Sequence, residues 1–118
     1  MSYTSFDYSD LHLSALTPRS FEVSFKVRNT GKYDGEEVAQ LYLRDEYASV
    51  VQPLKQLKHF ARLFLKCGEE QEVKFILSEE DFALVDRNLK RVVEPGTFQV
   101  MIGAASDDIR LQTKVEIK

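Results

Sequence analysis

The sequence predicts an all-β fold: an antiparallel sandwich of two sheets with about seven or eight short strands and one short helical turn. Several segments alternate apolar and polar residues with a period of two, as half-buried strands do. Gly-, Asn-, Asp- and Pro-containing turns separate these segments. The 118 residues fit a single domain that spans residues 1–118.

The first expected strand contains four apolar residues, but its alternation changes phase near residues 9–10. Residues 21–28 alternate without a break and predict a half-buried antiparallel strand. Residues 29–35 follow as a loop, and its two glycines with Asn and Asp suit positive φ angles. The apolar residues of the first strand are Phe6, Tyr8, Leu11 and Leu13.

Residues 38–44 are apolar on nearly both faces, which predicts a central strand covered on two sides. Tyr42 is out of phase with its apolar neighbours, so we expect it to point away from one core face. Residues 45–53 interrupt the pattern and predict a long surface loop. The next strand, residues 57–65, changes phase near Phe60, which indicates a bulge.

A turn at residues 66–69 leads into a strand at residues 70–77. Ser78 is followed three residues later by Asp81, a spacing that resembles a capping box and predicts one short helical turn.

Residues 90–93 predict another short strand, and Pro95-Gly96 turns the chain. The following strand alternates inward, and Asp107-Asp108 turns the chain again before the last strand. The inward residues of these two strands are Phe98, Val100, Ile102, Ile109, Leu111, Val115 and Ile117.

The composition excludes several classes of partner. The net charge is −3, from 16 basic and 19 acidic residues, whereas nucleic-acid binding needs a concentrated basic surface. No apolar run reaches the roughly 18 residues of a membrane span, and the N-terminus lacks signal-peptide features. We therefore expect neither a nucleic-acid nor a membrane partner. A single cysteine, Cys67, excludes an internal disulfide.

No catalytic, metal-binding or cofactor-binding residue is expected. The carboxylates of residues 79–81 suit the start of a helix, where they stabilise its dipole, better than a pair facing across a cleft. His12 and His59 lie on different strands without ligands at metal spacing. Cys67 and His59 flank a turn, and a plain free thiol is favoured over a catalytic pair.

Two surfaces are candidates for binding. The loop at residues 45–54 concentrates apolar side chains that cannot all be core, so it predicts a docking surface, with a self-packed loop as the alternative. Its expected contacts are Tyr47, Val50, Val51 and Pro53. The second candidate is a sugar-binding surface that uses the rings of Tyr33, Tyr42 and Tyr47. Packing at strand edges or against a neighbouring domain is the alternative for these tyrosines.

Four segments in order resemble the fibronectin type III-like domain at the C-terminus of family 3 glycoside hydrolases, the β-glucosidase and β-xylosidase group. They are SYTSFDYSDLHLS, VRNTGKYDGEEVAQLYLRD, PLKQLKHFARLFLKCGEEQEVKFIL and DFALVDRNLKRVVEPGTFQVMIGAASDDIRL. The chain departs from that pattern at three positions: His59 replaces a common Gly, Cys67 a common Pro, and Arg91 a frequent Trp.

This resemblance implies an immunoglobulin- or fibronectin III-like sandwich that acts as a non-catalytic accessory domain. Its partners would be the catalytic domains of the same glycosidase, which cleaves O-glycosyl bonds. In that family the nucleophile and the general acid lie in preceding domains, so no catalytic residue carries over. Arg91 joins the expected interdomain contacts.

Met1 directly before the first matching segment indicates a domain excised from a larger enzyme. We expect the isolated domain to be a monomer, and the parent to be periplasmic or secreted rather than cytoplasmic. A carbohydrate-binding module and a cell-surface adhesion domain remain the alternative functions.

Overall fold

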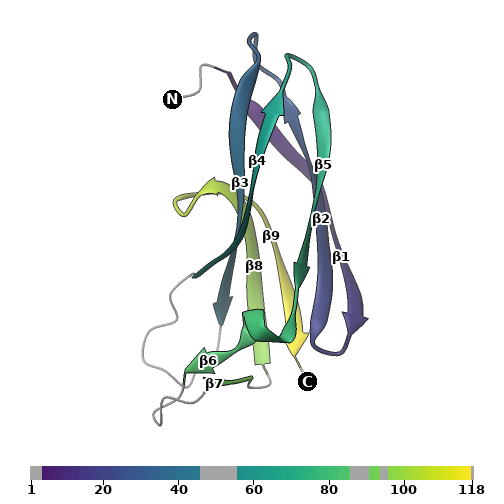
Figure 1. Cartoon of the computed structure of the whole chain (residues 1–118), viewed down its shortest axis with the longest axis vertical. Coiled ribbons are helices and arrows are strands. Elements are labelled where there is room, and N and C mark those ends of the chain that lie inside the picture. The colour runs from purple at the N-terminus through teal and green to yellow at the C-terminus, as the bar shows by residue number, and fades with distance from the viewer. Residues whose placement is uncertain (1–3, 46–55, 86–90, 94–95, 118) are drawn as a thin grey trace.

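The chain forms a two-sheet sandwich, seen here in a computed structural model that describes residues 4–45, 56–85, 91–93 and 96–117 (Figure 1). One sheet has three strands in the order β1-β2-β5, namely β1 (Phe6–Thr17), β2 (Ser20–Asn29) and β5 (Glu70–Leu77). The other has four in the order β4-β3-β8-β9, namely β4 (Gln56–Leu65), β3 (Gly35–Asp45), β8 (Gly96–Ala105) and β9 (Asp108–Ile117). All paired neighbours are antiparallel.

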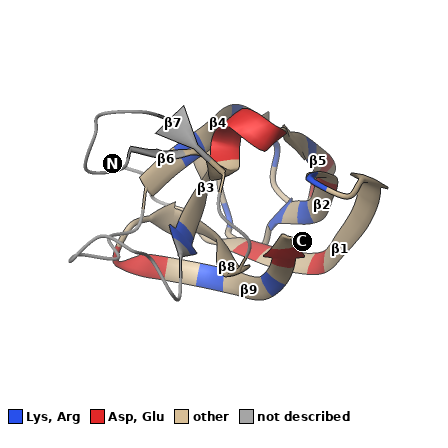
Figure 2. Cartoon of the chain, turned by 90° about the horizontal axis from the view of Figure 1, so that it is seen from below, with Lys and Arg blue, Asp and Glu red and all other residues tan. Residues whose placement is uncertain are grey.

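A short 3-10 turn, η1 (Glu79–Phe82), and a small hairpin connect the two sheets after β5. The hairpin consists of β6 (Leu84–Val85) and β7 (Arg91–Val92), and it lies with η1 at one end of the sandwich (Figure 1). The acidic residues of η1 are visible there when the molecule is seen from that end (Figure 2). The predicted capping box is confirmed, since Ser78 and Asp81 bond reciprocally.

The core lies between the sheets and is built by alternate residues of each strand, as the period of two predicts. The predicted inward residues Phe98, Val100 and Ile102 of β8 are all buried. The strand β3 is central, between β4 and β8, as its apolar pattern predicts. The largest fully buried apolar side chains are Phe25, Phe82, Leu41, Leu65, Leu77, Ile102 and Ile117.

A row of rings crosses this core from one edge of the sandwich to the other. Tyr8 stacks on Phe25 at 5.9 Å between ring centroids, and Phe25 contacts Phe75 at 5.8 Å. Phe75 stacks on the imidazole of His59 at 5.6 Å. Because these residues belong to β1, β2, β5 and β4, the row joins all three strands of one sheet to the edge of the other.

A charged group closes each end of the row. At one end the guanidinium of Arg110 lies over the Tyr8 ring, donates to the Phe6 carbonyl at 2.9 Å, and binds Asp108 through two nitrogens. At the other end Nε2 of His59 lies 3.1 Å from the Asp81 carboxylate. The first contact holds β9 of one sheet against β1 of the other, and the second holds β4 against η1.

The hydrogen bond from Arg110 lowers the pKa of Asp108. Burial, and then the nearby Glu37 charge, raises the pKa of Tyr8. Ionisation of the Tyr8 hydroxyl is therefore disfavoured.

One buried side-chain amide joins several strand ends at the end of the sandwich opposite η1. Asn29 is fully buried, and its Nδ2 donates to the carbonyls of Tyr33 at 2.8 Å and Leu65 at 3.0 Å. Its Oδ1 accepts from the Gly31 amide at 3.0 Å and the Thr4 hydroxyl at 2.7 Å. Every hydrogen-bonding position of the side chain is occupied, so the amide costs no unpaired polar group.

This arrangement corrects the expectation that residues 29–35 use positive φ angles. Among the described residues, positive φ occurs at Asp10, Gly68 and Gly96, and not in this loop. Gly31 is needed for space instead, because a Cβ there would lie 1.8 Å from Oγ1 of Thr4 and 2.6 Å from the Ser5 amide.

Register shifts mark bulges in four strands: β1, β4, β9 and, at Ala104, β8. The predicted phase break of β1 is an irregularity between Ser9 and His12. The predicted bulge of β4 lies at residue 58, two residues before the expected position, because consecutive residues of β3 pair with Leu57 and His59. A third bulge places Arg110 as the extra residue of β9. The preceding turn falls at residues 106–107, one residue earlier than predicted.

We expect Asn29→Leu to lower the free energy of unfolding by about 3 kcal/mol, because two carbonyls and one amide lose their partner in a buried place. The melting temperature should fall by about 10 °C in thermal denaturation followed by circular dichroism. Gln71→Leu, a similar change at an exposed position, is the control. Equal melting temperatures for the two variants would contradict the role of the buried amide.

The stability conferred by Asp108 should depend on pH. Since its folded pKa lies below the ordinary value of 3.8, the carboxylate stabilises the fold above that value. This contribution is lost as the pH falls through the folded pKa. The difference in unfolding free energy between the wild type and Asp108→Asn should therefore shrink from about pH 6 to about pH 2 in urea titrations. Asp107→Asn in the adjacent turn is the matched control, and a pH-independent difference would refute the prediction.

Candidate interdomain surface

The outer face of the four-stranded sheet carries an apolar patch. It comprises Leu57, Phe60 and Phe64 of β4, Tyr42 of β3 and Met101 of β8, and we call it the outer-face patch. The three β4 residues are exposed by 49%, 61% and 63%, respectively. Large apolar side chains gathered on one face more often mark a contact surface than an ordinary solvated one.

Strand pairing places these residues side by side. Tyr42 pairs with Leu57 on one side and with Met101 on the other, so the three side chains share a face. Phe60 pairs with Gln40, whose Oε1 accepts a hydrogen bond from the Tyr42 hydroxyl. Phe64 continues the same face four residues along β4.

The patch has a closed floor and an open rim. Tyr42 and Met101 are only 8% and 6% exposed although neither belongs to the core between the sheets. Both side chains are therefore largely shielded from water. The exposed ring of Phe60 stands at the edge of this floor, where a partner could cover it. Phe64 pairs with Glu36 and lies farther along the same face, beyond Arg62.

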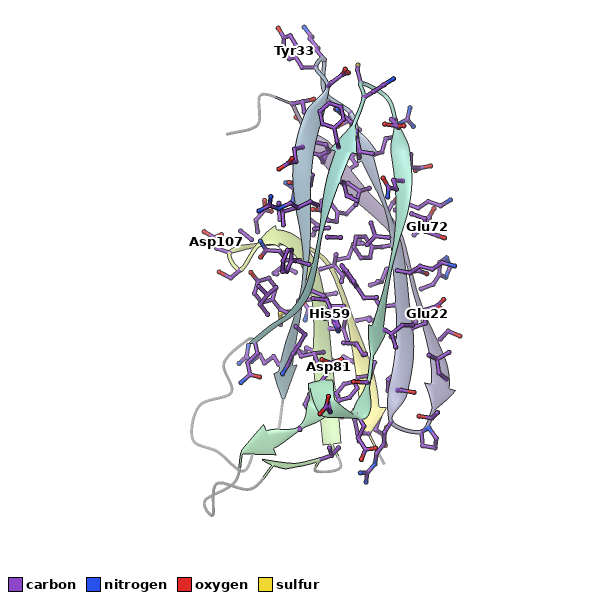
Figure 3. All side chains as sticks on the ribbon, viewed as in Figure 1. Glu22, Tyr33, His59, Glu72, Asp81 and Asp107 are labelled. Atoms are coloured by element: carbon purple, nitrogen blue, oxygen red, sulfur yellow. The ribbon has the colours of Figure 1, made fainter. Side chains whose placement is uncertain are left out.

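The outer face of the three-stranded sheet is different. Its β2 and β5 strands present Glu22, Lys26, Glu72 and Lys74, and Lys26 is paired with Asp10 of β1 at 3.4 Å. Glu22 and Glu72 project outward from this side in Figure 3. Its two exposed large apolar residues are Leu16 and Ile76, which lie on different strands. This face has the pattern of a solvated surface.

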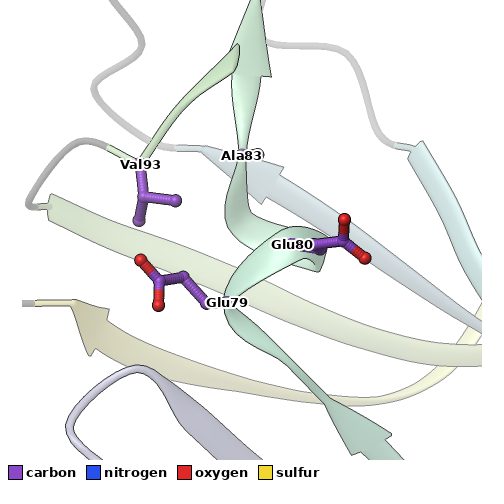
Figure 4. Close-up of a pocket in the computed structure, with 4 residues that line it drawn as sticks. All are labelled: Glu79, Glu80, Ala83 and Val93. Atoms are coloured by element: carbon purple, nitrogen blue, oxygen red, sulfur yellow. The ribbon is translucent and has the colours of Figure 1, made fainter.

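The end of the sandwich near η1 holds a pocket of about 300 Å³, lined by Glu79, Glu80, Ala83 and Val93. The carboxylate of Glu79 turns toward Val93, whereas that of Glu80 points to the other side of η1 (Figure 4). Glu79 is also paired with Arg19 at 3.2 Å. Two carboxylates that diverge in this way cannot face each other across a substrate bond.

The side chains of His59 and Asp81, near this pocket, make structural contacts. His59 and Asp81 point toward each other (Figure 3), and the same Asp81 oxygen accepts from the Ser78 amide at 2.9 Å. His59 thus links β4 to the capping box. Its ring stacks on Phe75, and its Nε2 lies beside the Asp81 carboxylate.

Cys67 is exposed, and its thiol donates to the Gly31 carbonyl at 3.1 Å, away from His59. Among residues 4–45, 56–85, 91–93 and 96–117, no group of three His, Cys, Asp or Glu residues could hold a metal ion. In the same ranges no helix has the length and hydrophobicity needed to cross a bilayer.

The predicted loop contacts Tyr47, Val50, Val51 and Pro53 lie outside the described residues. Arg91 lies in β7, where it pairs with Val85. The structure therefore does not test these predicted contacts.

The tyrosines of the sugar-binding alternative do not form a common platform within the described chain. Tyr33 is 62% exposed in the loop between β2 and β3, at the far end of the molecule (Figure 3). Tyr42 lies nine residues along the chain on the floor of the outer-face patch, roughly 30 Å away for an extended strand. As predicted, it points away from the core between the sheets. Its 8% exposure leaves little ring surface for a sugar to stack on.

Sequence reasoning missed Phe60 and Phe64 as surface residues. The signal was present, since Leu57, Phe60 and Phe64 give this strand a second face that is apolar except at Arg62, but it was interpreted only as a bulge. A strand with two apolar faces is fully covered in the middle of a sheet. Here the second face of β4 belongs to the outer face of the four-stranded sheet, where Phe60 and Phe64 remain exposed.

The chain matches the model of the fibronectin type III-like domain family over residues 37–106. It is 45% identical over 115 residues to a "Beta-xylosidase" of Formosa agariphila, covering 93% of this chain and 16% of that protein. It is 40% identical to a "Periplasmic beta-glucosidase" of Salmonella typhimurium, covering 93% of this chain and 15% of that protein. The chain thus spans about a sixth of the length of these relatives.

The same relation holds for solved structures. The crystal structure of a GH3 β-glucosidase from Bifidobacterium adolescentis superposes with a TM-score of 0.93 and 31% sequence identity. The match covers 99% of this chain and 18% of that one. The whole sandwich therefore occurs as one part of a much larger protein.

If the outer-face patch serves a partner rather than the fold, removing its rings should hardly affect the isolated chain. We expect Phe60→Thr and Phe64→Thr each to change the unfolding free energy by less than about 1 kcal/mol, since threonine keeps β-propensity. The same change at the fully buried Phe25 should cost about 3 kcal/mol or more. Urea denaturation measures all three, and a core-sized loss at Phe60 would show that its ring supports the fold.

Proposed function

The chain belongs to the fibronectin type III-like domain family, and we propose that it is a non-catalytic accessory domain of a family 3 glycoside hydrolase. The parent would be a β-glucosidase or β-xylosidase that hydrolyses O-glycosyl bonds. In this proposal the domain packs on the catalytic domains of the same chain and stabilises them.

One observation supports this proposal most strongly. Nearly the whole chain aligns with glycosidases, yet it accounts for only 15–18% of their length. A free-standing domain would be expected to match relatives of its own size. The remaining five-sixths of these proteins is ample for the catalytic domains.

The chemistry of the described residues is consistent with a structural role. The carboxylates near the pocket at η1 diverge, and the two ionisable clusters that cross the sandwich, at Arg110 and His59, are engaged in packing. A fold whose polar groups are used internally offers stability and surface to a partner rather than a reaction centre.

The loop at residues 45–54 remains a proposed contact with the catalytic domains, through Tyr47, Val50, Val51 and Pro53, and Arg91 is proposed to join it. We also propose that the parent enzyme works outside the cytoplasm. The name of the Salmonella typhimurium relative, a periplasmic β-glucosidase, supports this location.

Deleting this domain from the parent enzyme should lower its melting temperature, because the catalytic domains lose an interface. Meanwhile the isolated chain should hydrolyse neither aryl-glucoside nor aryl-xyloside above the buffer background. Calorimetry of the full and truncated enzymes and a chromogenic assay measure the two effects. Unchanged thermal stability after the deletion would refute the accessory role.

A sugar titration separates this proposal from a carbohydrate-binding module. Cello- and xylo-oligosaccharides added to the isolated chain should leave its amide NMR shifts unchanged. Saturable shifts around Tyr33 would instead favour the binding module.

A further inference from the structure

We propose that the outer-face patch is the surface through which this domain packs against the remaining part of its own parent chain, with Phe60 as the central contact. This inference rests on the proposed accessory role and names the face that performs it. The partner is thus a neighbouring domain of the same polypeptide, and it presents a predominantly apolar surface.

The two outer faces of the sandwich provide an internal comparison. Both faces belong to sheets of the same domain. If both were exposed to solvent, we would expect polar residues at most outward positions of each. The three-stranded face follows that pattern: most outward residues of β2 and β5 are charged, and Lys26 and Arg28 lie opposite Glu72 and Glu70. The four-stranded face departs from it, with three exposed large apolar residues on the single strand β4.

The position of Phe60 makes it the natural centre of a contact. It pairs with Gln40, which holds the Tyr42 hydroxyl, so its ring borders the water-excluded floor of the patch. Leu57 and Phe64 lie on either side of it along β4. Contacts that contribute most to association are typically aromatic side chains surrounded by neighbours that already exclude water.

The size of the patch favours a partner in the same chain over a second copy. Three side chains exposed by half to two-thirds present roughly 300 Å² of apolar surface. A stable complex of separate molecules buries about 800 Å² on each partner. A tethered domain needs less, because the covalent connection raises its effective concentration. In the relatives, about five-sixths of the chain lies outside the matched domain and is available as that tethered partner.

The test uses the full-length parent enzyme carrying Phe60→Thr and Phe64→Thr. The matched control carries Leu16→Thr and Ile76→Thr, two exposed apolar residues of the opposite sheet. Limited proteolysis measures how fast the intact domain is released. We expect release at least about tenfold faster for the Phe60 and Phe64 variant, and within about twofold of the wild type for the control. Equal release rates for the two variants would overturn the proposal.

A second substitution shows that the effect comes from apolar packing. Phe60→Leu keeps an apolar side chain, so it should restore most of the slow release. If Phe60→Leu is as fast as Phe60→Thr in the same Phe64→Thr background, loss of apolar contact is not the cause and the proposal fails.

The deletion variant separates this proposal from the one on which it rests. If removing the domain destabilises the parent while the Phe60 and Phe64 variant behaves like its control, the accessory role stands and the chosen face is wrong. If removal has no effect, the accessory role itself fails. Sedimentation of the isolated chain tests the other possible partner, a second copy of the domain. A dimer that dissociates on Phe60→Thr would identify that partner and overturn the assignment to the parent chain.

Discussion

The sandwich depends on one buried amide where strands of both sheets end. Asn29 belongs to β2, yet its side chain binds the carbonyl at the end of β4, the loop that leads to β3, and the segment before β1. Its backbone amide donates to Glu69 in the turn before β5, and its carbonyl accepts from Gly68. Two sheets held only by apolar contact could slide, because hydrophobic attraction has no direction. Hydrogen bonds with fixed partners define one alignment of the sheets at this end.

The edges of the sandwich are held by a second set of contacts, the row of rings with a charged group at each end. Arg110 holds β9 to β1, and the pair of His59 and Asp81 holds β4 to η1. Each end of the row is therefore tied to a neighbouring element through a charged side chain. The outer-face patch takes no part in the row of rings or in the hydrogen bonds of Asn29.

Alternation along the chain predicted most of the strands, because a half-buried strand must repeat every two residues. It also predicted the phase break in β1, and the three-residue spacing of Ser78 and Asp81 predicted the capping box. Both are local features set by residues close in the sequence. Neither the role of Asn29 nor the exposure of Phe60 could be found in this way. Both depend on tertiary arrangement: Asn29 meets Leu65 across 36 positions, and the exposure of Phe60 depends on what covers the outer face of the four-stranded sheet. Periodicity shows that a residue faces one side of a sheet, but it does not show what covers that side.

The bulges have a consequence for how this domain can meet other proteins. In the register of the described strands, β1, β4 and β9 each carry an extra residue, and all three are edge strands. The fourth edge, β5, presents Glu70, Glu72 and Lys74 along its length. A kinked or charged edge is a poor template for adding a strand from another molecule. The domain can therefore expose aromatic rings on a sheet face without adding strands edge to edge. Association through the face of the sheet remains open to it.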